Sequence, residues 1–145
     1  MQDRLKSRVW DPQEKKMHYN DFVITSTGYV AKLENLPEAA NRNGVKLNTG
    51  VFIIDQTNLD FDKTMVVMQC TGMEDKNSQL IYESDILEDP VHKFKVVWNE
   101  YSFAISGASK KGEEKQVYFF PLLARTFEVI GNIYENPELL EGGGK

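Results

Sequence analysis

Histidine and cysteine, the residues most typical of zinc sites and thiol nucleophiles, are rare in this sequence. The chain contains two histidines, His18 and His92, and one cysteine, Cys70. Neither histidine has a second metal ligand at a spacing typical of zinc sites, and no nucleophile motif surrounds the cysteine. We therefore expect the histidines to be structural or at the surface, and Cys70 to be a small buried hydrophobic residue. No metal and no cofactor is predicted; a site assembled from residues distant in the sequence is the alternative.

An acidic segment in the middle of the chain resembles the start of a calcium-binding loop. Asp75, Asn77 and Gln79 occupy positions one, three and five of that pattern. An EF-hand also needs glycine at position six and glutamate at position twelve, where this chain has Leu80 and Ile86. The calcium pattern fails, and we expect Asp75 and Asn77 to bond the backbone of their own turn.

Two further carboxylates, Glu83 and Asp85, follow this turn. Paired carboxylates can perform acid–base chemistry. We favour a structural role, in which they cap the next turn or accept a backbone N–H across the fold. The sequence also lacks the two glycine-rich patterns that bind phosphates, GxGxxG and GxxxxGK followed by Ser or Thr. We therefore predict that the chain is not an enzyme.

A basic strand face near the N-terminus is a candidate interaction surface. Residues 3–10 alternate, so that Arg4, Lys6, Arg8 and Trp10 point to one side of a predicted strand. Lysine and arginine beside an aromatic ring could bind a nucleic-acid backbone and stack its bases. A solvated strand face is the alternative, and we favour it.

The composition predicts an ordered, soluble protein. The chain has 145 residues, of which 41% are hydrophobic, and a formal net charge of -5. An acidic chain is not drawn to nucleic acid by its net field. A single cysteine fits a reducing compartment. We find neither a secretory leader nor an apolar stretch of membrane-spanning length. These features predict a cytoplasmic protein without membrane contact.

Short strands separated by turns dominate the pattern, and the predicted fold is mainly β. Up to residue 64 we expect a β-rich lobe with hairpins at 3–19 and 22–31, a long loop or short helix near 37–44, and a buried strand at 51–54. Residues 65–140 contain six further strand candidates, spaced as in a small barrel. Gly131 should mark a bulge or a close backbone approach. Residues 141–145 are expected to form a frayed tail.

The C-terminal segment is too apolar to lie free in solvent. After its strand, residues 136–140 should form a helical turn. We expect four of its residues to pack against the strand that holds Phe94, Val96 and Trp98; they are Ile130, Ile133, Tyr134 and Leu139.

Four separate motifs carry a family resemblance: residues 8–11 with 15–17, residues 68–86, residues 97–98 with 103, and residues 128–140. Together they resemble the YopX-like family of phage and prophage proteins. The positions that carry the central signature are Gln69, Thr71, Gly72, Asp75, Asn77, Tyr82, Glu83 and Asp85. Ser78 and Ser84 depart from it, because the family usually has glycine at both turns, where glycine would suit a positive φ.

The resemblance implies an origin in a phage or prophage and a C-terminal SH3-type barrel, and it implies no activity. The expected architecture is an N-terminal β-rich lobe followed by a small SH3-type β-barrel. We predict a non-enzymatic phage accessory protein in the host cytoplasm that acts by protein binding or self-assembly. Its expected partners are further copies of itself, or a host or phage protein. A nucleic-acid-binding barrel is the alternative.

Overall fold

The computed structural model describes residues 6–20, 22–24, 30–32, 65–108 and 114–141. These residues fall into two compact units, one within 8–67 and the other made of residues 6–7 and 68–141. The boundary expected from the sequence lies between residues 64 and 65. The segments expected at 37–44 and 51–54 lie outside the described residues.

The first unit contains two antiparallel hairpins, and both were predicted from the sequence. Strand β1 (Ser7–Asp11) pairs with β2 (Lys16–His18). The turn between them begins at Asp11, whose side chain accepts the backbone N–H groups of Gln13 and Glu14. Strand β3 (Phe22–Ile24) pairs with β4 (Val30–Lys32). Both hairpins follow from β-branched and aromatic residues interrupted by turn formers.

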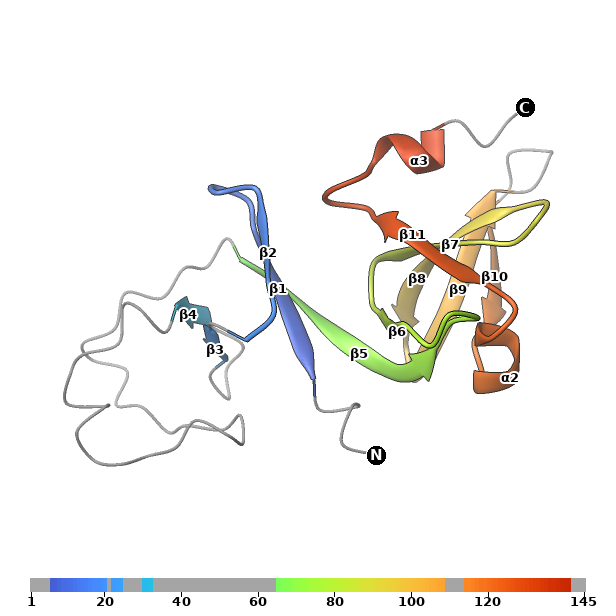
Figure 1. The fold of residues 1–145 in the computed structure, drawn as a ribbon, viewed down its shortest axis with the longest axis horizontal. Coiled ribbons are helices and arrows are strands. Elements are labelled where there is room, and N and C mark those ends of the chain that lie inside the picture. The colour runs from blue at the N-terminus through green and yellow to red at the C-terminus, as the bar shows by residue number, and fades with distance from the viewer. Residues whose placement is uncertain (1–5, 21, 25–29, 33–64, 109–113, 142–145) are drawn as a thin grey trace. The chain divides into compact units, whose positions relative to one another are not determined.

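The second unit is built on a five-stranded antiparallel sheet in the order β10-β9-β8-β7-β11 (Figure 1). Its strands are β7 (Asp85–Glu88), β8 (Lys93–Asn99), β9 (Ser102–Ala108), β10 (Glu114–Tyr118) and β11 (Glu128–Asn132). The first four form a meander, and β11 returns to pair with β7. This is the strand order of an SH3-type barrel, so the predicted mainly-β class is confirmed.

Four further elements complete this unit. Strand β5 (Val66–Glu74) pairs with β6 (Leu80–Tyr82), and both strands precede those of the sheet in the sequence. A single helical turn, α2 (Pro121–Ala124), separates β10 from β11, and a second, α3 (Glu138–Glu141), follows β11. The sequence predicted α3. It did not predict α2, which begins at a proline that suits the first position of a helix.

One hydrophobic cluster fills the interior of the second unit. Strands β5 to β9 each contribute one buried residue, and the segment from residue 119 to residue 127 around α2 contributes the other three. The buried members are Met73, Ile81, Leu87, Val96, Ile105, Phe119, Ala124 and Phe127.

The C-terminal strand does not pack as we expected. It pairs with β7, whereas we placed it against the strand that holds Phe94, Val96 and Trp98. Trp98 is 50% exposed and not part of the core. It lies one residue from the end of β8, beyond the buried Val96, and packs edge-on against Phe103 with ring centroids 4.9 Å apart. The alternation was correct, but the core ends before this position.

Both roles predicted for Gly131 are confirmed. The register of β11 against β7 shifts between Val129 and Gly131, which marks a bulge. A methyl group at Gly131 would also collide with the Asn136 side chain and approach Leu139 within 3.0 Å. The glycine thus allows the segment after β11 to fold back closely.

Replacing Gly131 by alanine should therefore destabilise the protein. The added methyl group forces Asn136 and Leu139 to move, and overpacking of this kind costs about 1–3 kcal/mol. Urea denaturation followed by tryptophan fluorescence measures the free energy of unfolding. An unchanged midpoint would contradict the close approach.

The two serines that replace the family's glycines have left-handed backbones. Ser78 has φ 62° and Ser84 has φ 70°. This conformation is unfavourable for residues with a Cβ and easy for glycine. The expectation of positive φ at these turns is therefore confirmed, and both serines are strained.

Ser78→Gly should stabilise the protein by about 0.5–1 kcal/mol, because relief of the left-handed strain exceeds the added freedom of the unfolded chain. The control is Ser102→Gly in strand β9. Glycine within a strand is unfavourable, so this variant should lower the free energy of unfolding by about 0.5–1 kcal/mol. Urea midpoints report both changes. A loss of stability in Ser78→Gly would show that the turn is not strained.

Candidate functional site

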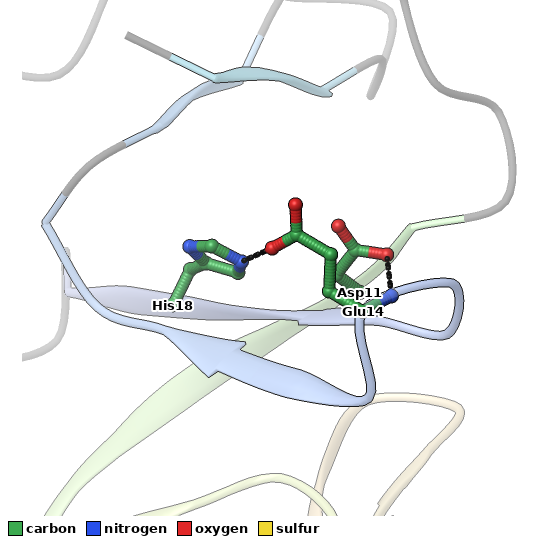
Figure 2. A group of neighbouring side chains, drawn as sticks. All are labelled: Asp11, Glu14 and His18. Carbon is green, nitrogen blue, oxygen red and sulfur yellow. Dashed lines mark hydrogen bonds and ion pairs between the residues drawn. The ribbon is translucent and has the colours of Figure 1, made fainter. Parts of the chain in front are cut away.

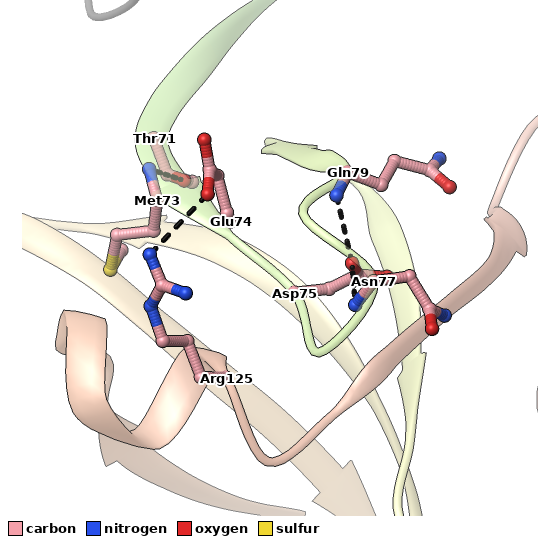
Figure 3. A network of polar contacts seen from close by, with 7 residues as sticks. All are labelled: Thr71, Met73, Glu74, Asp75, Asn77, Gln79 and Arg125. Carbon is pink, nitrogen blue, oxygen red and sulfur yellow. Dashed lines mark hydrogen bonds and ion pairs between the residues drawn. The ribbon is translucent and has the colours of Figure 1, made fainter.

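The central turn that carries the family resemblance is organised by one buried carboxylate. Asp75 is fully buried. Its Oδ1 accepts the backbone N–H groups of Asn77 at 2.8 Å and Gln79 at 2.9 Å (Figure 3). The expected bond from Asp75 to its own turn is thus present. The Asn77 side chain is exposed, and its backbone N–H is the group that bonds Asp75.

The same carboxylate also reaches a strand far along the chain. Its Oδ2 accepts the N–H of Val129 in β11 at 3.0 Å. Next to it, the backbone N–H of Lys76 bonds the carbonyl of Phe127 at 2.9 Å. Asp75 therefore joins the β5–β6 turn to the last strand of the sheet.

Other signature residues also bond the backbone. The Thr71 hydroxyl donates to the Ile81 carbonyl at 2.9 Å and accepts the N–H of Met73 at 3.0 Å. Asp85 is buried, and its Oδ2 accepts the Tyr82 N–H at 2.7 Å, as expected for a turn cap. These contacts hold the turns on either side of β6.

The remaining signature positions lie around the same two turns. The Gln69 side chain is exposed, while its carbonyl accepts the N–H of Glu83 at 2.9 Å. Gly72 has φ 74°, a conformation that glycine adopts without strain. Tyr82 and Glu83 are half-buried. The signature thus describes how the fold is built and brings together no catalytic constellation among the described residues.

Two ion pairs lie on the surface beside this network. Arg125 meets Glu74 at 3.4 Å, and Lys76 meets Glu128 at 2.5 Å. The hydrogen bond from Lys76 to Glu128, and the negative charge of that carboxylate, raise the pKa of Lys76 above its usual value. Both pairs are solvent-exposed, so each contributes little to stability.

The basic strand face proposed from the sequence is not an exposed surface. Arg8 is 4% exposed and Trp10 is 8% exposed, while Lys6 is exposed. Arg4 lies outside the described residues. The alternation of this strand is real, but burial on both of its faces keeps Arg8 and Trp10 away from solvent. The nucleic-acid hypothesis therefore gains no support from this face.

The cysteine and one histidine lie where the sequence analysis expected them. Cys70 is buried, and its Sγ accepts the Gly72 N–H at 3.4 Å. His92 lies at the surface with its Nδ1 3.6 Å from Asp89. His18 is 5% exposed and neighbours Glu14.

An apolar surface at β10 and α2 was not identified from the sequence. Val117 and Tyr118 end strand β10 and are 49% and 74% exposed. Phe120 and Leu122, at the start of α2, are 49% and 77% exposed. We call these four residues the β10–α2 surface. The available signal was the absence of charged residues from positions 117–124.

Within the described ranges, no helix has both the length and the apolar character needed to cross a membrane.

Asp75→Asn should destabilise the protein by roughly 2–3 kcal/mol, because the amide nitrogen would face the Val129 N–H and leave a buried donor without an acceptor. The matched control is Asp89→Asn. Asp89 makes the same kind of turn bonds, to Val91 and His92, but in an exposed loop. The amide oxygen of the asparagine can keep both bonds, so we expect a destabilisation of about 0.5 kcal/mol or less. Equal losses in the two variants, measured by urea denaturation, would contradict the special role of the Asp75–Val129 bond.

Comparison with known proteins agrees with this architecture. No curated protein matches the sequence. A crystal structure of protein EF1440 from Enterococcus faecalis is similar, with 26% sequence identity and a TM-score of 0.52 over 93% of this chain and 96% of that one. The family model described as YopX protein matches residues 6–141. The chain therefore belongs to the YopX protein family.

Proposed function

We propose that this protein is a non-enzymatic phage accessory protein that acts in the host cytoplasm by binding a second copy of itself. The observation that carries the proposal is the β10–α2 surface, where four large apolar side chains are exposed on consecutive elements. Four exposed large hydrophobic residues within six positions of the sequence favour an interaction site, whereas single exposed hydrophobic residues are common on any protein. Val117 and Tyr118 are neighbours in β10, so they point to opposite faces of the sheet beside its outer edge.

Strand β10 also lies at an edge of its sheet. Among the described strands it pairs with β9 alone. The outer edge of such a strand presents backbone donors and acceptors that another strand can pair with. Two copies of β10 can pair antiparallel about a two-fold axis, which is the commonest symmetry of homodimers. The apolar side chains next to the edge would then be buried together with the backbone.

The residues around this surface favour a protein partner. Trp98 packs against Phe103, and the N–H of Phe119, the residue after β10, bonds the Phe103 carbonyl at 3.1 Å, so further aromatic residues lie close to the end of β10. Aromatic side chains are enriched in protein interfaces. The net charge of -5 opposes a nucleic-acid backbone as the partner.

Tyr118→Lys tests this proposal directly. Lysine at an exposed edge position is a common natural block to strand pairing. We expect the full-length protein to have the mass of two chains in sedimentation or light scattering at micromolar concentration. The variant should dissociate to the mass of one chain and remain folded, because Tyr118 is 74% exposed.

The matched control is Val91→Lys. Val91 is 73% exposed and lies in the turn between β7 and β8, at the opposite end of β8 from Trp98. This variant should keep the mass of two chains. A wild-type protein that stays at the mass of one chain at every concentration would overturn the proposal, and so would a dimer that Tyr118→Lys leaves intact.

A further inference from the structure

The β1–β2 hairpin brings together three side chains that are separate in the sequence. Asp11 ends β1, Glu14 lies in the turn and His18 ends β2. One possible ligand atom from each of them lies within 4.8 Å of the other two. Figure 2 shows the carboxylate of Glu14 between the imidazole of His18 and the carboxylate of Asp11.

The register of the hairpin explains this arrangement. Val9 lies opposite His18, so these two residues share one face of the hairpin. Asp11 follows Val9 by two positions and therefore points to the same face. The turn then places Glu14 above that face, with Oε2 3.7 Å from the Nε2 of His18.

We propose that Asp11, Glu14 and His18 bind a divalent transition-metal ion of the Zn²⁺ type. Imidazole and carboxylate together are a common donor set for this ion. Bonds of ~2.0–2.2 Å in tetrahedral geometry separate the donor atoms by roughly 3.4 Å. The 3.7 Å between Glu14 and His18 is already close to that separation. The other separations do not exceed 4.8 Å, and the half-exposed side chain of Glu14 can move toward the ion.

Two features prepare the site for an ion. Asp11 and His18 are 2% and 5% exposed, which removes competing water from two of the ligands. The Oδ1 of Asp11 also accepts the N–H groups of Gln13 at 2.8 Å and Glu14 at 3.1 Å. These bonds hold the carboxylate in one orientation, as outer-sphere hydrogen bonds do at other metal sites.

Three protein ligands leave one tetrahedral position for water or for a donor from a bound molecule. The ion would join the end of β1 to the end of β2 and so fix the turn between them. A bound ion also stabilises the folded state over the unfolded state, because the unfolded chain does not hold the three ligands together.

The test uses the full-length protein without a histidine tag, after treatment with a chelator. Isothermal titration with Zn²⁺ should give one ion per chain. Co²⁺ should give visible absorption bands of tetrahedral type, without a thiolate band because no cysteine belongs to the triad. Glu14→Gln should weaken Zn²⁺ binding by at least about ten-fold, since even residues that only support a ligand have effects of this size. Glu14 is half-exposed, so this variant should remain folded, which circular dichroism checks.

The matched control is His92→Ala. His92 is the other histidine of the chain and also neighbours a carboxylate, with Asp89 3.6 Å away, but it lies at the surface outside the triad. Its loss should leave the affinity for Zn²⁺ unchanged. Three results would each overturn the proposal: no Zn²⁺ binding by the wild type, equal affinity in Glu14→Gln, or loss of binding in His92→Ala.

Discussion

The buried carboxylate of Asp75 holds the second unit together. A charged group without solvent is costly unless several donors surround it. Here three backbone N–H groups do so, two from its own turn and one from Val129 in β11. The local bonds shape the turn, and the distant bond attaches the last strand. A single side chain, whose two oxygens face different parts of the chain, thus links the β5–β6 turn to the last strand, beside the bond from the Lys76 N–H to the Phe127 carbonyl.

Side chains also bond the backbone in the turn that follows β11. The Oδ1 of Asn132 accepts the N–H groups of Tyr134 and Glu135, and its amide nitrogen donates to Glu135. The Asn136 side chain accepts the N–H of Asn132 at 3.4 Å, close to the backbone of Gly131. The polar residues of the family motifs thus bond mainly to the backbone. This explains why they look like a functional site in the sequence while their role is architectural.

The features available for interaction lie outside the central and C-terminal motifs, although the triad includes Asp11 of the N-terminal motif. The β10–α2 surface is apolar and exposed, and the triad of Asp11, Glu14 and His18 is polar and partly buried. Each belongs to a different unit of the chain. Neither depends on the signature residues, so changes at either place can be studied without disturbing the turn around Asp75.

The amino-acid sequence by itself determined the local structure. Alternation and turn residues predicted both N-terminal hairpins, the turn at Asp75 and the bulge at Gly131. The family resemblance added the positive φ of Ser78 and Ser84. These features depend on neighbouring residues, whose preferences can be read directly. Taken together, these local features also indicated a mainly β fold.

The tertiary structure alone decided which distant segments meet. Asp75 and Val129 are 54 positions apart, and nothing local shows that the final strand pairs with β7. The same applies to burial: alternation placed Arg8 and Trp10 on one face, but other parts of the fold cover that face. Trp98 is half-exposed, not buried as expected, because the core ends before this position. A period of two assigns residues to faces, whereas strand pairing and sheet closure determine what each face meets.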